Sequence, residues 1–189
     1  MANQAWQITS PGVIGLNDLG PIPRPQAKQA LVRIHAASLN YRDRLVIDHS
    51  KDYPTIAKQN LIPGSDGAGV VEAVGEGSVW KKGDRVVLQL NSWITGVDPR
   101  DFDITKTLGG GDVDGSFRRW AVVSDEWLFK APDGLSLEEV STMYTAGVTA
   151  FRSLMCEDVQ IGPGTTVLTQ GTGGVSCYAI MVSCEQILC

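Results

Sequence analysis

Glycines set among β-forming residues dominate the stretch from residue 64 to residue 87, GSDGAGVVEAVGEGSVWKKGDRVV. Its valines predict two short strands, residues 70–74 and 85–88, and Gly83-Asp84 predicts a tight turn into the second strand. Glycine is used where the backbone takes a positive φ angle or passes close to another segment. The stretch therefore predicts the corner of a small, strongly bent sheet or barrel.

The composition is that of a soluble globular protein. The chain has 189 residues, 43% hydrophobic and 20% charged, which is enough for a sizeable core. A formal net charge of −5 does not favour nucleic acid or an anionic membrane as a partner. The sequence has neither the long apolar run of a transmembrane helix nor a secretory signal at its start. We expect a cytoplasmic protein that acts on a small molecule.

Further elements follow from hydrophobic periodicity and turn residues. Ser136, with Glu139 three residues later, forms a capping box that predicts the start of a helix. A β-branched run then leads through a glycine-rich turn into a helix at 175–188. The additional predicted strands are 5–8, 30–36, 117–124, 127–130 and 165–170.

Residues 91–115 form a long irregular segment that ends in a glycine-rich run. It has two interpretations: a mobile loop over a substrate pocket, or a barrel connection without chemistry. The string Asp112-Val113-Asp114-Gly115 lacks the further oxygen ligands of a calcium loop, so calcium is not expected.

The glycine pattern resembles the signature of the medium-chain dehydrogenase/reductase superfamily. Val71, Val74 and the run Gly83-Asp84-Arg85-Val86 fit that signature. The string Ser38-Leu39-Asn40-Tyr41-Arg42-Asp43 and the segment 115–154 extend the resemblance to other parts of the chain. The resemblance implies a GroES-like barrel and hydride transfer with NADH or NADPH.

The residues at the family's metal positions do not suit zinc. Ser65 and Asp66 replace the His-Glu pair of the zinc alcohol dehydrogenases, and Asn40 stands where a cysteine ligand would be. Residues 91–107 contain none of the four cysteines of a structural zinc site, and His35 is expected to be a half-exposed strand residue. We expect no metal, as in the zinc-independent branch that includes quinone and enone reductases.

The resemblance implies that Asn40 and Tyr41 contact the nicotinamide end of the cofactor and that Thr149 lies beside its ring. The Asn40 amide can both donate and accept hydrogen bonds, which suits a catalytic role. From the residues alone, Asn40 is equally a helix N-cap and Thr149 an ordinary helix residue. Asp43 is expected to form a surface ion pair with Arg42 or Arg44 rather than to act as an acid or base.

A dinucleotide-binding turn is predicted between the 165–170 strand and the last helix. Glycines at such a turn let the backbone approach a pyrophosphate, and the helix N-terminus supplies free N–H groups. The expected cofactor-binding residues of this turn are Gly171, Gly173, Gly174, Val175 and Ser176.

The acidic or basic residue that reads the ribose is expected about 20 residues after these glycines, beyond position 189. We therefore expect a chain truncated inside the Rossmann domain, with weak or absent NADH or NADPH binding. The apolar residues Val175, Ala179 and Val182 of the last helix would then be covered by a homo-oligomer or a partner chain.

The predicted fold class is β-rich α+β: a partly opened GroES-like β-barrel followed by the first β-α unit of an incomplete Rossmann fold. The predicted domains are a GroES-like catalytic domain, 1–130, and a linker helix with the start of the nucleotide-binding domain, 131–189. The predicted function is zinc-independent hydride transfer to an activated C=C or a carbonyl, impaired by the truncation. The alternative is a non-redox protein, an isomerase, cyclase or partner-binding barrel, that kept the pocket and lost the cofactor.

Overall fold

The computed structural model describes residues 2–90, 100, 102–155 and 161–187. The chain forms two compact units, Met1–Ser141 and Thr142–Cys189. Each unit is described by itself.

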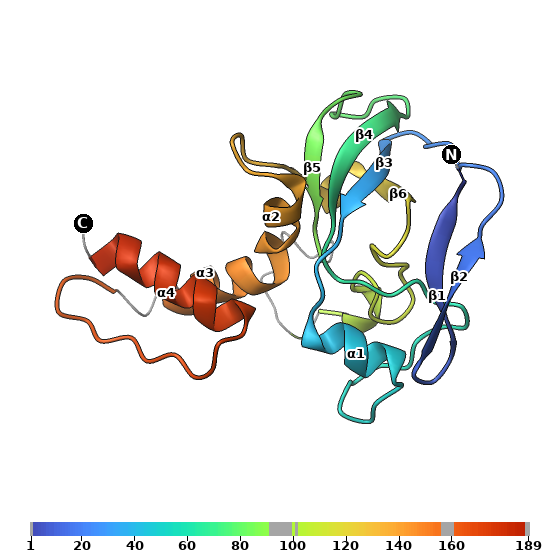
Figure 1. The fold of residues 1–189 in the computed structure, drawn as a ribbon. Coiled ribbons are helices and arrows are strands. Elements are labelled where there is room, and N and C mark those ends of the chain that lie inside the picture. The colour runs from blue at the N-terminus through green and yellow to red at the C-terminus, as the bar shows by residue number, and fades with distance from the viewer. Residues whose placement is uncertain (1, 91–99, 101, 156–160, 188–189) are drawn as a thin grey trace. The chain divides into compact units, whose positions relative to one another are not determined.

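The first unit is built on two antiparallel sheets (Figure 1). A hairpin of β1 (Gln4–Ser10) and β2 (Val13–Asp18) lies beside a five-stranded sheet of order β6-β3-β4-β5-β7. The strands of the larger sheet are β3 (Gln29–Ala36), β4 (Ala68–Val74), β5 (Arg85–Leu88), β6 (Trp120–Ser124) and β7 (Leu128–Lys130). The predicted β-rich, partly opened barrel is confirmed, although β2 was not predicted.

Inward-facing residues of neighbouring strands meet to form the core of the first unit. Val32 of β3 lies opposite Val71 of β4 on one side and Ala121 of β6 on the other. Alternation along β3 leaves His35 exposed, as the periodicity predicts. The buried cluster consists of Ala30, Val32, Val71, Val86, Leu88, Leu108, Ala121, Val123 and Leu128.

The predicted strand 117–124 begins three residues too early. The N–H of Phe117 donates to Pro63 and the N–H of Arg119 donates to Gln4, so these residues bond to other segments before β6 begins. The Phe117 carbonyl in turn accepts from Trp6 of β1. This bend links the small sheet to the large one.

The loop before β4 is buried over the whole of residues 61–69. Gly64 in this loop has a φ angle of 104°, and a Cβ there would collide with the Phe117 ring. The backbones of Gly109 and Gly115 pack directly on Gly64, where they also leave no room for side chains. Close backbone packing, rather than loop flexibility, explains these glycines.

The short helices among the described residues of the first unit are α1 (Tyr41–Ile47), η2 (Ile104–Lys106), η3 (Asp125–Trp127) and α2 (Leu137–Ser141). The predicted capping box before α2 is present: the N–H of Ser136 donates to Glu139 Oε2 at 2.8 Å, and the N–H of Glu139 donates to Ser136 Oγ at 3.1 Å. The box fixes where α2 begins.

The described part of the 91–115 segment is tied to the rest of the first unit. Asp114 accepts a hydrogen bond from the N–H of Ile62 and pairs with Lys58. Thr55 donates to the carbonyl of Gly110. These bonds favour a structural connection over residues 102–115; residues 91–99 and 101 of the predicted loop lie outside the described residues.

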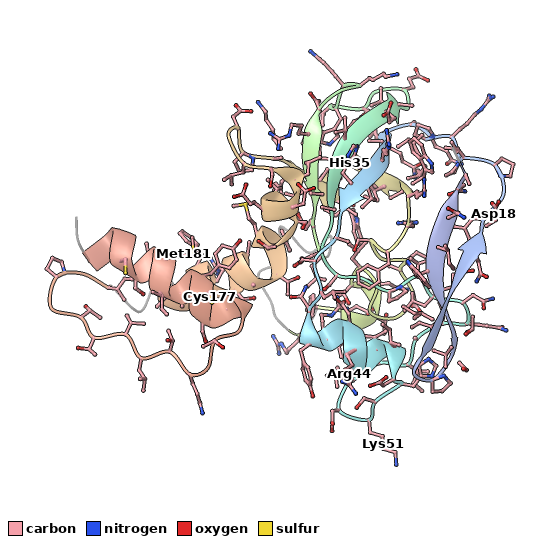
Figure 2. All side chains as sticks on the ribbon, in the orientation of Figure 1. Asp18, His35, Arg44, Lys51, Cys177 and Met181 are labelled. Atoms are coloured by element: carbon pink, nitrogen blue, oxygen red, sulfur yellow. The ribbon has the colours of Figure 1, made fainter. Side chains whose placement is uncertain are left out.

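The second unit contains three helical segments, η4 (Met143–Val148), α3 (Thr149–Leu154) and α4 (Gly174–Ile187). A Cβ at Gly174 would lie 3.0 Å from the Ala146 side chain, so α4 begins close against η4. Within this unit Ala179 is buried, whereas Val175 is exposed, so the predicted apolar face of α4 is partly covered. Cys177 and Met181 mark α4 in Figure 2.

The predicted strand at 165–170 does not form. These residues are irregular, and Leu168 is 94% exposed. A strand needs a neighbour that accepts and donates its backbone hydrogen bonds. Among the described residues no strand pairs with this segment, so its β-branched sequence alone does not produce one.

We expect Gly64→Ala to lower the free energy of unfolding by about 3 kcal/mol, because it adds backbone strain and a collision in the core. Gly77→Ala is the matched control. Gly77 also has a positive φ angle, 69°, but a Cβ there meets nothing within 4 Å. It is expected to cost about 1 kcal/mol. Equal losses for the two variants in urea denaturation would contradict the packing explanation.

Candidate functional site

A polar cluster lies where the buried 61–69 loop passes the start of α1. Asn40 occupies the N-cap position of α1, and its side-chain nitrogen donates to Ser65 Oγ at 2.9 Å and to Asp66 Oδ2 at 3.0 Å. Ser65 and Asp66 are fully buried, whereas Asn40 is half-buried. The cluster therefore presents part of its polar surface outward while its carboxylate stays inside.

Ser38 joins this cluster from the end of β3. Its hydroxyl lies 3.1 Å from Asp66 Oδ2 and 3.1 Å from the carbonyl oxygen of Ser141. A hydroxyl has one proton, so it can donate to only one of these acceptors at a time. Ser38 thus links the loop to the end of α2. We call Ser38, Asn40, Asp43, Ser65 and Asp66 the polar cluster.

Asp43 pairs with Arg42, as predicted, but it is buried and not on the surface. The residue is 2% exposed, and its Oδ2 accepts the backbone N–H of Asn40 at 2.9 Å. Burial raises the pKa of Asp43 above 3.8, against the lowering effects of the Asn40 hydrogen bond and of Arg42. Arg44 pairs instead with the exposed Asp48, on the outer side of α1 (Figure 2).

Arg42 holds α1 against residues 107–108. Its guanidinium donates to the Tyr53 hydroxyl at 2.8 Å and to the Leu108 carbonyl at 2.9 Å, and it also contacts Thr107 Oγ1 at 3.3 Å. The nearest Arg42 nitrogen is 3.9 Å from Asp43. Arg42 therefore serves mainly to anchor the helix that carries Asn40.

The other predicted nicotinamide-site residues are less constrained. Tyr41 is 77% exposed. The hydroxyl of Thr149 donates to the carbonyl of Thr145 at 2.6 Å, one helical turn earlier, which is the behaviour of an ordinary helix threonine. Asn40 is both an N-cap by position and a member of the polar cluster. Contact of these three residues with a cofactor stays a prediction.

The predicted dinucleotide-binding turn before α4 has an open glycine backbone. Gly171 has a φ angle of 81°, and a Cβ on Gly171 or Gly173 would meet nothing within 4 Å. The Ser176 hydroxyl donates to the Gln170 carbonyl at 3.0 Å and closes the turn over the helix N-terminus. An open glycine backbone at a helix start fits the pyrophosphate of a dinucleotide. Val175, the remaining predicted residue, is exposed in the first turn.

A groove of about 580 Å³ also opens on the first unit. Its wall includes the β1–β2 hairpin, so the sequence analysis, which missed β2, could not have located it. No aspartate or glutamate lines the groove, and neither Asn40 nor Asp66 does. Its principal lining residues are Trp6, Leu16, Ile34, His35, Phe117 and Arg118.

Within the described residues, no group of three or more histidine, cysteine, aspartate or glutamate side chains could hold a metal ion. In the same part of the chain, no helix is long and apolar enough to cross a membrane.

Asp43 gives the folded protein a defined pH dependence. Between pH 3.8 and its raised pKa, the folded state keeps a proton that the unfolded chain releases. The free energy of unfolding should therefore fall as pH rises through this window. In Asp43→Asn this fall should disappear, as measured by urea unfolding at a series of pH values.

Asp112→Asn is the control for this experiment. Lys106 lowers the pKa of the exposed Asp112. This carboxylate therefore makes the free energy of unfolding rise slightly with pH, opposite to the effect of Asp43. Asp112→Asn should remove that small rise. An unaltered pH profile in Asp43→Asn would show that the pKa of Asp43 is the same in the folded and unfolded states.

The alcohol dehydrogenase GroES-like domain family matches residues 26–133. A zinc-type alcohol dehydrogenase-like protein of Schizosaccharomyces pombe is 42% identical over 154 residues, covering 80% of this chain and 44% of that protein. Human quinone oxidoreductase is 28% identical over 184 residues, covering 96% of this chain and 49% of that protein. The chain spans about half the length of these relatives.

Solved structures agree with the sequence relatives. An NAD-dependent alcohol dehydrogenase superimposes with a TM-score of 0.81 at 28% identity, over 97% of this chain and 55% of the other. Together, the bent glycine-rich barrel, the match over residues 26–133 and these relatives show that the chain belongs to the alcohol dehydrogenase GroES-like family of the medium-chain dehydrogenase/reductase superfamily.

Proposed function

We propose that this chain is part of a zinc-independent NAD(P)H-dependent oxidoreductase that transfers hydride to an activated C=C, as in an enone or quinone, or to a carbonyl. The polar cluster carries this proposal. Its side chains are an amide, two hydroxyls and two carboxylates, linked by hydrogen bonds. Thiolates and imidazoles, the ligands that zinc prefers, are absent from it.

The cluster suits a reaction in which hydrogen bonds stabilise the negative charge that develops on a substrate oxygen. Ser38 is half-buried and its hydroxyl is shared between two acceptors, so it can turn to donate to a substrate oxygen. Arg42 and Asp43 fix the start of α1 and thereby hold Asn40. Asn40 orients the bound ligand. The substrate itself is a small molecule.

When bound, NADH or NADPH supplies the hydride. The chain's own contribution to holding it would be the open turn at Gly171 and Gly173 and the start of α4, which accommodate the pyrophosphate. A dinucleotide crevice also needs a ribose site and an adenine site, and this chain spans about half the length of its relatives. Alone it should bind NADPH weakly or not at all, with an exposed face of α4 available to a second copy or a partner chain.

The protein is expected to purify without stoichiometric zinc, because amide and hydroxyl groups stand at the family's zinc-ligand positions. Elemental analysis after mild chelation is the measurement. One zinc per chain retained after that treatment would refute the zinc-independent assignment, and the zinc-type relative makes this a real alternative.

In a protein that carries these residues together with a complete nucleotide-binding sheet, Asn40→Ala and Thr149→Ala should each slow NADPH-dependent reduction of an enone or quinone about fivefold. Each variant removes one polar contact, roughly 1 kcal/mol. Single-turnover absorbance of NADPH measures the hydride step.

Val79→Ala, at an exposed position outside the polar cluster, is the control variant. If both test variants reduce the substrate at unchanged rates, Asn40 serves only as a helix cap and Thr149 only in helix packing. Calorimetry that detects no NADPH binding to this longer protein would favour the non-redox alternative, an isomerase, cyclase or partner-binding barrel.

A further inference from the structure

The side-chain nitrogen of Asn40 makes its hydrogen bonds to buried residues of the protein. An amide nitrogen carries two protons. One lies toward Ser65 Oγ, 2.9 Å away, and the other toward Asp66 Oδ2, 3.0 Å away. Both donors are therefore used inside the polar cluster.

Asp66 determines which way this amide faces. Asp66 Oδ2 lies 3.0 Å from the Asn40 side-chain nitrogen and accepts its N–H, so the nitrogen and not the oxygen of the amide faces Asp66. With the nitrogen inward, Asn40 Oδ1 lies on the side of the first turn of α1, in a capping-box arrangement with Asp43. A carbonyl oxygen has two lone pairs, so this arrangement leaves it able to accept a further hydrogen bond.

Asp66 is itself held from several directions. Its backbone carbonyl accepts the Ser116 hydroxyl at 2.6 Å, and its Oδ2 is also in reach of Ser38. The residues on both sides of it, from 61 to 69, are buried. If the Asp66 side chain rotated away from Asn40, its buried Oδ2 would lose the hydrogen bond from the Asn40 amide nitrogen, which is costly in the core.

We propose that Asp66 is the positioning residue of this site: it locks the Asn40 amide with its nitrogen inward, so that Asn40 offers a ligand only a hydrogen-bond acceptor. The proposal rests on the proposed function for its ligand. The group that Asn40 recognises is then an O–H or N–H donor, such as the hydroxyl of a reduced substrate, while a carbonyl oxygen is recognised by Ser38. This revises the expectation that the Asn40 amide both donates to and accepts from a ligand.

The lock is tested by the rates at which the two side-chain N–H protons of Asn40 exchange with water. These rates are measured by NMR on the intact chain. In the unaltered protein both protons should exchange slowly. Asp66→Ala should speed one of them by about tenfold or more, the equivalent of one hydrogen bond to a charged group. Ser65→Ala should speed the other one and leave the Asp66-facing proton slow.

Ser116→Ala is the matched control, because it removes a buried hydrogen bond from the same loop without touching the Asn40 amide. It should lower stability and leave both exchange rates unchanged. If Asp66→Ala does not fold, two other variants still test the lock. Ser65→Ala should show the exchange pattern given above. Asp66→Asn keeps an acceptor oxygen, so the proton that faces residue 66 should stay slow. Two fast protons in the unaltered protein, or the same change in all variants, would overturn the lock.

The recognition of a donor is tested with a matched probe pair, cyclohexanol and cyclohexanone. The alcohol should shift the Asn40 side-chain signals in the unaltered protein at least about threefold more than the ketone at equal concentration, and Asp66→Ala should remove that difference. Equal shifts from both probes would refute the acceptor-only assignment. Because neither measurement uses turnover, loss of NADPH-dependent reduction with an intact exchange pattern would refute the proposed function and not the lock.

Discussion

The structure of the first unit depends on how a carboxylate is accommodated in its core. Asp66 is fully buried in a loop that is buried from end to end, and an unpaired charge at such a position is strongly destabilising. Asn40 and Ser38 supply the hydrogen bonds that Asp66 needs. The end of β3, the start of α1 and the loop before β4 are therefore held together by hydrogen bonds to the buried carboxyl group of Asp66.

Glycine packing provides the second constraint. The loop can be buried because the backbones of Gly109 and Gly115 come into direct contact with Gly64. Gly109 and Gly115 both belong to the 102–115 connection, so this tight contact joins the loop to that connection. Arg42 reinforces the same junction from the side of α1. Close-packed backbone therefore lies directly beside Ser65 in the polar cluster.

Much of this arrangement could be predicted from local sequence. Hydrophobic periodicity gives β3, and the valines of the glycine-rich stretch give β4 and β5. The Ser136–Glu139 capping box gives the start of α2, and the family signature places Asn40, Ser65 and Asp66 at one site. The burial of Asp43 could not be predicted, because nothing in its neighbours along the chain shows that residues far away cover α1.

The failed prediction of a strand at 165–170 has a related cause. A β-branched run supplies propensity, but a strand also needs hydrogen-bonding neighbours, which propensity does not describe. The β2 strand shows the converse. Its sequence is weakly β-forming and contains Gly15, yet it forms a strand because it pairs with β1 from Gln4 opposite Asp18 to Ser10 opposite Val13. Pairing partners, which are a property of the whole fold, decide both cases.

The complete burial of residues 61–69 determines how the site can be lost. Segments that open by themselves are those with exposed backbone and few buried contacts, and this loop has neither property. Its backbone carbonyls accept hydrogen bonds from Ile8 of β1, from Leu88 of β5 and from the segment that contains Gly115 and Phe117, which are three different parts of the first unit. The loop can therefore open only when the barrel itself opens. Local fluctuation does not dismantle the polar cluster, and its lifetime is that of the folded barrel.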